Sequence, residues 1–97
     1  MSERIDSLKR LIEKAYNCKA NHAASTPIRE MFRGELVWEG VIETFDLEGV
    51  VNSSRCYAFE FVLDDQPEVR TVLAVDGIDS PHKALQAAIA ASSKKAP

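Results

Sequence analysis

The stretch Gly34-Glu-Leu-Val-Trp-Glu-Gly-Val-Ile-Glu-Thr-Phe-Asp-Leu-Glu-Gly49 decides the fold of this chain. It contains the only tryptophan and is dense in β-branched and aromatic residues, which favour a half-buried strand. Alternation of side chains predicts two faces. One face carries Leu36, Trp38, Ile42 and Thr44, and the other carries Val37, Glu39, Val41, Glu43 and Phe45. We therefore predict the first and longest strand of an antiparallel sheet here.

Gly40 lies near the middle of this predicted strand. A glycine in a strand has no side chain to pack and often marks a bulge. At roughly 3.3 Å per residue, the run between the flanking glycines would be about 45 Å long if it were straight. We therefore predict a bulge or bend at Gly40.

The composition indicates one compact domain spanning residues 1–97, with 45% hydrophobic residues. No apolar run is long enough for a membrane span, and the first residues do not form a signal peptide. Cys18 and Cys56 stand alone in the sequence, so we expect free thiols in a reducing compartment and hence a cytoplasmic location. The formal net charge of −3 provides no basic surface for nucleic acid.

Before the central stretch, apolar residues at the helical period predict a helix over about 3–18, capped by Ser2. We interpret residues 19–33 as a connector. Within it, Thr26-Pro27 has the pattern of a helix cap followed by proline, which predicts a short helical turn over 27–32. His22 precedes this turn and is expected to be solvated or to act as a cap.

After the central stretch, two more strands are predicted over 55–63 and 69–75, joined by a hairpin at residues 64–67. In the first of these, Tyr57, Phe59, Phe61 and Leu63 share one face, and Cys56, Ala58, Glu60 and Val62 share the other. In the second, Val69, Thr71, Leu73 and Val75 alternate with Arg70, Val72 and Ala74. Ser80-Pro81 starts a last helix over about 81–92, followed by a basic tail over 93–97.

This order predicts an α+β fold of two layers, α-β-β-β-α, with a three-stranded antiparallel meander sheet over about 35–76. Consecutive antiparallel strands usually pair, so the strand over 55–63 is expected to be central. Its aromatic face is expected to pack against both helices, which would lie on one side of the sheet.

The sequence shows no arrangement of residues that is typical of catalysis. It contains no Gly-x-Ser-x-Gly motif, no metal-ligand spacing around either histidine and no glycine loop for phosphate. We therefore predict that the chain is not an enzyme, with no catalytic, cofactor-binding or metal-binding residues and no cofactor.

The second face of the sheet is predicted to mix apolar and charged residues, which is typical of an interface. The predicted interaction face consists of Glu39, Val41, Glu43, Ala58, Glu60, Val62, Arg70 and Val72. Its partner would be an unidentified protein or a second copy in a homodimer. Three alternatives remain open. One of the helices could cross the sheet and cover this face. The face could also be solvated, with weak ion pairs, and the third alternative is a small-ligand pocket between Trp38, Tyr57 and the helices.

The order of elements, with an alanine-rich last helix beginning Ser80-Pro81-His82-Lys83-Ala84, resembles the double-stranded RNA-binding domain. That family contacts RNA through the basic start of its last helix, which Lys83 matches, and through the loop between its first two strands. The resemblance implies nucleic-acid contacts at Arg55, Lys83, Lys94 and Lys95, whereas the acidic net charge opposes such binding. The chain also resembles small bacterial proteins of unassigned activity. Our leading hypothesis is a non-catalytic protein-interaction module of the bacterial cytoplasm, and the alternative is a divergent nucleic-acid-binding protein.

Overall fold

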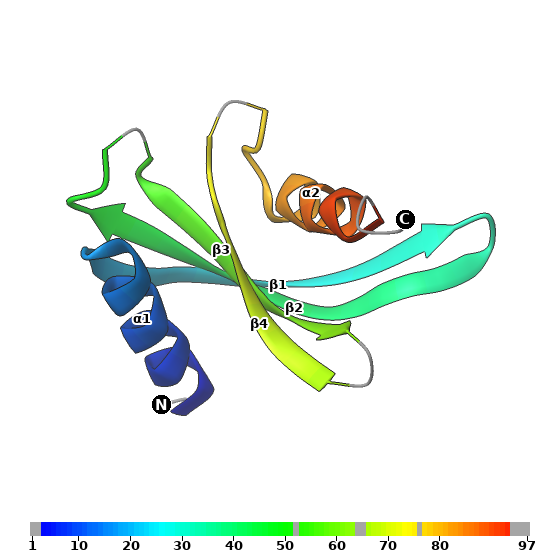
Figure 1. Cartoon of the computed structure of the whole chain (residues 1–97), viewed down its shortest axis with the longest axis horizontal. Helices are drawn as coiled ribbons and strands as arrows, with labels where there is room; N and C mark the ends of the chain where they lie inside the picture. Colours follow the sequence, from blue (N-terminus) through cyan, green and yellow to red (C-terminus); the bar gives the residue numbers. More distant parts are fainter. Residues whose placement is uncertain (1–2, 52, 64–65, 76, 94–97) are drawn as a thin grey trace.

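The computed structural model describes residues 3–51, 53–63, 66–75 and 77–93. These residues form α1 (Glu3–Tyr16), β1 (Lys19–Phe32), β2 (Glu35–Glu48), β3 (Arg55–Leu63), β4 (Gln66–Leu73) and α2 (Pro81–Ser93). The strands form one antiparallel sheet in the order β1-β2-β3-β4 (Figure 1). The predicted α+β class is confirmed, and β3 lies inside the sheet as expected. The predicted count of three strands is wrong, because the described residues contain four.

The additional strand is β1, which occupies most of the predicted connector over 19–33. The helical turn predicted after Thr26 is also wrong, because Pro27 pairs with Val41 inside the β1–β2 ladder. Proline is tolerated there because β1 is an edge strand, where a residue without an N–H group can face solvent. The strand predicted over 34–49 is therefore confirmed as β2, the second strand of the chain.

A two-residue turn joins β1 to β2. Arg33 and Gly34 have φ angles of 52° and 82°, and they connect the paired residues Phe32 and Glu35. Positive φ at both central residues is typical of the tight hairpin turn that matches the twist of the flanking strands. This turn allows both strands to run for 14 residues each.

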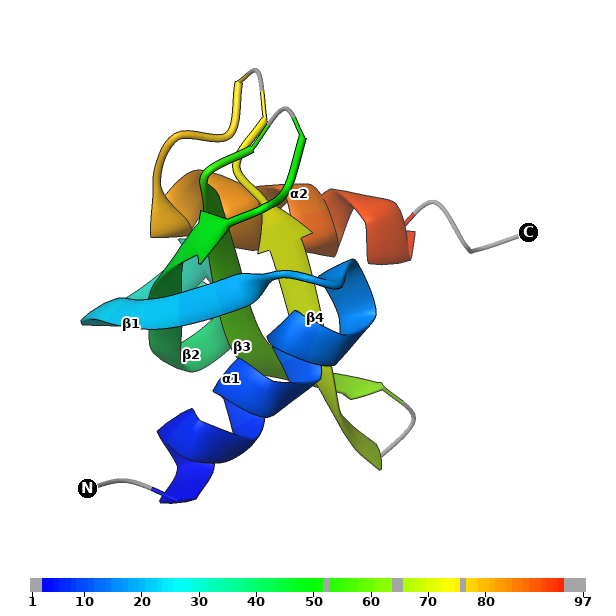
Figure 2. The same cartoon turned by 90° about the vertical axis from the view of Figure 1, so that its left-hand side faces the viewer.

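The two helices cover opposite faces of the sheet (Figure 2). On one face, Leu8 and Ile12 of α1 pack on the apolar cluster that contains Phe45, Cys56 and Ala58. On the other face, α2 packs on the second cluster, which contains Ile42, Tyr57, Phe59, Ala84 and Leu85. The predicted two-layer arrangement, with both helices on one side, is therefore wrong, because α1 crosses to the face that we expected to be open.

The faces of β4 differ from the predicted ones. Tyr57 pairs with Val72 and Ala58 pairs with Thr71, so Val72 shares the face of the aromatic residues. Val72 and Ala74 accordingly pack in the α2-side cluster, whereas Leu73 packs in the α1-side cluster. The predicted assignment of the two faces of this strand was inverted.

The sheet consists of two hairpins that share a narrow junction. β2 and β3 pair only from Glu43–Asp46 to Arg55–Ala58, whereas β1–β2 and β3–β4 pair along nearly their whole lengths. Beyond the junction the hairpins diverge (Figure 1). The side chain of Trp38 spans this divergence, since its indole Nε1–H donates a hydrogen bond to the carbonyl oxygen of Glu60 at 2.9 Å. A packed tryptophan is expected to find a hydrogen-bond partner for its indole N–H, and for Trp38 this partner is the backbone carbonyl of Glu60, which lies outside the β2–β3 ladder.

Gly40 does not form the predicted bulge. It pairs regularly with Ile28, and the irregularity of β2 falls at Val37, because Glu30 pairs with Trp38 and Met31 pairs with Leu36. Gly40 instead provides space. A Cβ atom at this position would lie 2.9 Å from Cη2 and 3.1 Å from Cζ2 of Trp38. The absence of a side chain at Gly40 therefore allows the indole ring to lie across the strand.

Substitution of Gly40 by alanine is expected to displace the indole ring and to lower the free energy of unfolding by about 1–3 kcal/mol, the usual cost of overpacking. Loss of the hydrogen bond to Glu60 should shift the emission of Trp38 to longer wavelength. In a Trp38→Phe background the smaller ring should make Gly40→Ala nearly neutral. An unchanged emission spectrum together with equal destabilisation in both backgrounds would contradict this assignment.

The helix termini follow the expected chemistry. α1 ends at Tyr16 rather than near residue 18, because Asn17 adopts a φ of 51° and the Cys18 amide donates to the carbonyl oxygen of Glu13 at 3.2 Å. Ser80 caps α2 as predicted, since the Lys83 amide donates to its Oγ at 3.2 Å. Neither described helix is long and apolar enough to cross a membrane.

Candidate interaction surfaces

The structure divides the predicted interaction face between two sides of the sheet. Glu43 and Ala58 pair on the α1 side, whereas Val72 packs on the α2 side, and Arg70 pairs with Phe59 there. Glu39 and Val41 lie in phase with Glu43 along β2, and Glu60 lies in phase with Ala58 along β3. The side chain of Val62 lies outside the described part of the structure. The eight residues therefore do not form one surface.

The centre of the predicted face is buried under α1 rather than open. Ala58 is fully buried, and only 2% of Glu43 is exposed. Ala58 packs in the same apolar cluster as Leu8 and Ile12 of α1, within the same chain. An interaction surface must therefore be sought in the parts of the molecule that neither helix covers.

Glu43 is the centre of a polar network that joins three elements. Arg4 of α1 donates to its Oε2 at 2.5 Å, and His22 of β1 lies 2.8 Å from its Oε1. The hydroxyl of Ser25, also on β1, donates to the same Oε1. The ring of His22 also meets Phe45 edge-on, at a centroid distance of 5.3 Å. A buried carboxylate is thus matched by donors from α1 and β1.

An irregularity in β1 creates this network. His22 and Ser25 are three residues apart, and in a regular strand residues at this spacing point to opposite faces. The register shifts at Ala23, because His22 pairs with Phe45 whereas Ala24 pairs with Thr44. The extra residue brings His22 and Ser25 to the α1 side together.

The network is not arranged as a nucleophile, a base and an orienting acid. In such a triad the two ring nitrogens of histidine contact different partners. Here His22 Nε2 lies 2.8 Å from Glu43 Oε1 and 3.3 Å from Ser25 Oγ, so one nitrogen faces both groups. Burial raises the pKa of Glu43, but hydrogen bonds from Ser25, His22 and Arg4 outweigh burial and hold this pKa below its ordinary value. The network therefore stabilises a charged carboxylate and ties α1 to the sheet.

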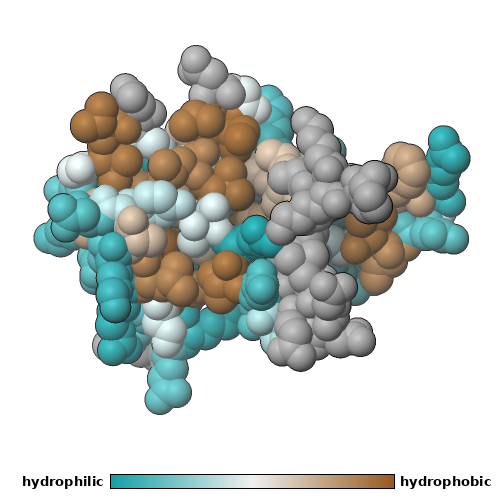
Figure 3. All heavy atoms as spheres, in the orientation of Figure 1, coloured by the Kyte–Doolittle hydropathy of each residue, from teal (hydrophilic) through white to brown (hydrophobic). Residues whose placement is uncertain are grey.

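The most exposed group of large apolar side chains lies at the end of the β1–β2 hairpin. The exposed fractions are 49% for Met31, 64% for Phe32, 52% for Leu36 and 45% for Val37. The guanidinium of Arg33 lies over the ring of Phe32, 5.2 Å from its centroid. Figure 3 shows hydrophobic and hydrophilic side chains side by side at this end of the molecule. We call these four apolar residues the hairpin end.

The hairpin end borders an open hollow of about 300 Å³ lined by Glu30, Phe32, Val37 and Ile89. α2 supports the hollow, because His82 Nε2 lies 2.5 Å from Glu30 Oε1 and Gln86 donates to Glu30 Oε2 at 3.5 Å. The hydrogen bond with His82 lowers the pKa of Glu30. Apolar side chains of β1, β2 and α2 thus line the hollow, and the charged Glu30 lies at its edge.

This surface was not predicted, because a helical turn over residues 27–32 would place Met31 and Phe32 in the core. The signal was present in the sequence as Met31-Phe32 and Leu36-Val37 on either side of Arg33-Gly34-Glu35. Two apolar pairs that flank a short glycine-containing segment are typical of a hairpin. On a helix Met31 and Phe32 would have faced the core, whereas at the end of a projecting hairpin they face solvent.

The predicted nucleic-acid contacts that the structure describes are both paired with carboxylates. Arg55 pairs with Asp46 at 3.2 Å, and Lys83 pairs with Asp79 at 2.9 Å. Lys94 and Lys95 lie outside the described residues. Cys18 and Cys56 are free thiols, and burial raises the pKa of Cys56 to about 12. Tyr57, expected beside a ligand pocket, is packed in the α2-side cluster.

Within the described ranges, no group of three or more His, Cys, Asp or Glu side chains is placed to hold a metal ion. Comparison with known protein families, curated proteins and solved structures finds no match. Proposals about function therefore depend on the surfaces of this chain alone.

Proposed function

We propose that this chain is a non-catalytic protein-interaction module that binds a partner through the hairpin end. The observation that supports this is the group of four large apolar side chains, each about half exposed, on a projecting hairpin. Exposed apolar side chains that are bordered by charged groups are typical of protein interfaces. Aromatic residues, methionine and arginine are also enriched in such interfaces, and Phe32, Met31 and Arg33 supply one of each.

The construction of the hairpin favours a binding role over a purely structural one. The Arg33–Gly34 turn and the ladder from Lys19 to Phe32 hold the hairpin end in a fixed conformation, so little ordering is needed on binding. The adjacent hollow offers space for one apolar side chain of a partner. The free thiols of Cys18 and Cys56 are consistent with a reducing compartment, and we place this function in the bacterial cytoplasm.

Photo-crosslinking tests this proposal. A crosslinking amino acid placed at Phe32 is expected to capture a discrete partner from a lysate of the source cells, and Leu36→Asp in the same chain should abolish the product. The matched control places the crosslinker at Val51, which is 83% exposed but lies in the β2–β3 loop. Identical products from both positions, or products that survive Leu36→Asp, would show that the hairpin end is not the binding surface.

Nucleic-acid binding is the second proposal, and it has less support, because the α-β-β-β-α order that resembles the double-stranded RNA-binding domain is not the observed order. Arg55 and Lys83 are each paired with a carboxylate, so a phosphate would have to compete with Asp46 or Asp79 for them. Titration with duplex RNA and duplex DNA at low salt distinguishes the two functions. Salt-sensitive binding that is lost on Lys83→Glu would reverse their order.

A further inference from the structure

One side of the sheet is only partly covered. α1 is the sole described helix on its side, and it packs through Leu8 and Ile12 on the cluster that contains Phe45, Cys56 and Ala58. Along β4, Val69 remains 39% exposed, and on the helix Leu11 is 43% exposed. A hollow of about 190 Å³ separates the first turns of α1 from Val69, and it is lined by Arg4, Ser7, Leu8, Phe59, Glu60 and Val69. The flank of α1 that faces β4 thus borders an uncovered apolar groove.

This flank of α1 has a regular pattern of residues. Ser7 and Leu11 are four residues apart, and Glu3 and Lys14 continue the same flank toward the two ends of the helix. All four residues are exposed. Neither Glu3 nor Lys14 forms an ion pair within the described part of the chain, whereas Arg4 is engaged by Glu43. The flank therefore presents an unpaired acid at its N-terminal end, an exposed leucine, and an unpaired base at its C-terminal end.

Such a flank is complementary to itself. If two α1 helices lie antiparallel about an axis between Ser7 and Leu11, the leucine of each helix meets the serine of the other. Glu3 then lies opposite the partner's Lys14, and the same pair recurs on the other side of the axis, as a two-fold interface requires. The small Ser7 side chain permits close approach of the helices, and the antiparallel helix dipoles attract.

We propose that two copies of this chain associate through the flank of α1 formed by Glu3, Ser7, Leu11 and Lys14, with the groove beside Val69 partly covered by the partner's helix. The self-complementary charges specify a second copy as the occupant, because each helix carries both an acid and a base and contributes one half of each of the two ion pairs. The contact is small compared with a standard protein interface, so the dimer is weak and depends on concentration.

The proposed dimer surface is separate from the hairpin end. α1 and the end of the β1–β2 hairpin lie at opposite ends of the longest axis of the molecule (Figure 1). Self-association through α1 therefore leaves both hairpin ends free to bind partners and makes the assembly bivalent. The two proposals rest on different residues, so either one can fail without the other.

Charge reversal tests the dimer. Sedimentation of the full chain over a hundredfold range of concentration is expected to show a monomer–dimer equilibrium. Glu3→Lys and Lys14→Glu should each raise the dissociation constant about tenfold, because each replaces two attractions by two repulsions. The double variant Glu3→Lys with Lys14→Glu should restore dimerisation to near the original value. Leu11→Ser should weaken it in any charge background.

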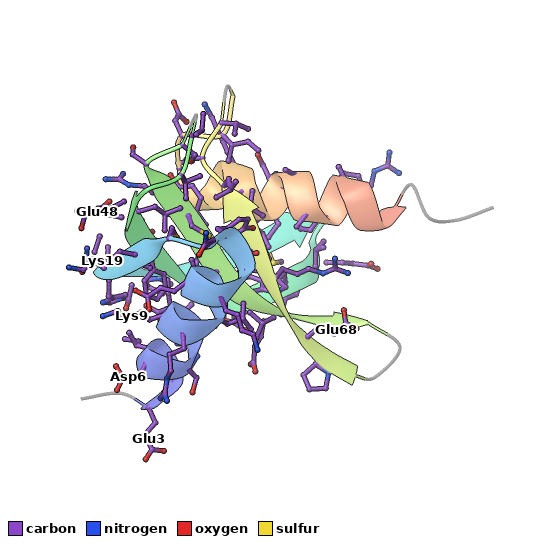
Figure 4. The ribbon with its side chains drawn as sticks, turned by 60° about the vertical axis from the view of Figure 1, so that its left-hand side comes forward. Glu3, Asp6, Lys9, Lys19, Glu48 and Glu68 are labelled. Carbon is purple, nitrogen blue, oxygen red and sulfur yellow. The ribbon has the colours of Figure 1, made fainter. Side chains whose placement is uncertain are left out.

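One matched control is Lys9, which lies on the opposite flank of α1 and projects away from β4 (Figure 4). The other is Glu35, which is exposed at the start of β2, far from α1. Glu35→Lys and Lys9→Glu make the same changes in net charge as the test variants and should leave the dissociation constant unchanged. Unfolding monitored by Trp38 emission checks that every variant is folded. A mass that stays monomeric at all concentrations would overturn the proposal. Failure of the double variant to recover, or equal loss in the controls, would also overturn it.

Discussion

Substitution of Phe59 by alanine is expected to lower the free energy of unfolding by roughly 3–5 kcal/mol, the usual cost of removing a buried phenylalanine side chain. Phe59 is fully buried in the α2-side cluster. Its ring meets that of Trp38 edge-on, with the centroids 5.8 Å apart and the planes at 79°. The substitution therefore leaves a cavity between Trp38 and α2, at the point where the two hairpins begin to diverge.

Urea denaturation followed by Trp38 emission and by circular dichroism measures this loss. Phe32→Ala is the matched control, because the same atoms are removed from a side chain that is 64% exposed. The control should stay within about 0.5 kcal/mol of the original stability. A loss below about 1 kcal/mol for Phe59→Ala would show that the ring does not belong to the core.

Substitution of Glu43 by glutamine is expected to lower the free energy of unfolding by about 2 kcal/mol at neutral pH, within the range for hydrogen bonds to a charged group. The carboxylate is 2% exposed and accepts bonds from Arg4, His22 and Ser25. The larger penalty of a stranded buried charge does not apply, because the side chains of Arg4 and His22 are 45% and 30% exposed and water can solvate them.

The effect of this substitution should depend on pH in a defined direction. The pKa of Glu43 is lowered in the folded chain from an ordinary value of 4.5. The folded state therefore binds the proton less tightly than the unfolded state, and the carboxylate stabilises the fold fully above about pH 4.5. This contribution is lost as the pH falls through the lowered pKa. The difference in stability between the original chain and Glu43→Gln should shrink toward zero in acid.

Glu39→Gln is the matched control, because it makes the same change on the same strand. The side chain of Glu39 is 50% exposed and pairs with Arg29 at 3.0 Å, so its removal should cost less than about 1 kcal/mol. Unfolding curves for the three proteins across the acidic range provide the measurement. A pH-independent difference for Glu43→Gln would show that the network does not depend on the charge of the carboxylate.

The sequence was sufficient to predict a helix or strand where a single local signal determined that element. The β-branched and aromatic run from Leu36 to Phe45 predicted β2, the alternation around Phe59 predicted β3, and Ser80-Pro81 predicted the start of α2. In each case the local preference of the residues agreed with the final packing. The α+β class followed from these elements.

The sequence was misleading where tertiary structure overrides a local signal. Thr26-Pro27 is a good helix start, yet pairing with β2 stabilises residues 19–32 as a strand, and Pro27 fits because β1 lies at the edge. Because residues 19–32 were not predicted as a strand, both helices were wrongly predicted to lie on one side of the sheet. The apolar side chains of the second face indicated that a helix or a second copy would cover it, but they did not show which of the two does so.

The network around Glu43 could not be predicted from spacing. His22 and Ser25 reach one carboxylate only because Ala23 is an extra residue in the ladder, and such an irregularity leaves no mark in the pattern of residue types. Glu43 and Phe45 are two residues apart in a predicted strand, which indicated only that a charged residue shares a face of the sheet with Phe45. Its burial depends on α1, which lies some 40 residues earlier and donates through Arg4.

Pro27 also limits how this protein can meet other chains. An exposed edge strand is a template onto which a foreign strand can add through backbone hydrogen bonds, and such growth leads to aggregation. Pro27 leaves the middle of β1 without a donor, and Pro67 does the same near the start of β4, the opposite edge of the sheet. Lengthening of the sheet by backbone pairing is thus interrupted at both margins. This molecule therefore recognises partners through its side chains. Side chains distinguish partners by shape and charge, whereas an exposed backbone edge does not.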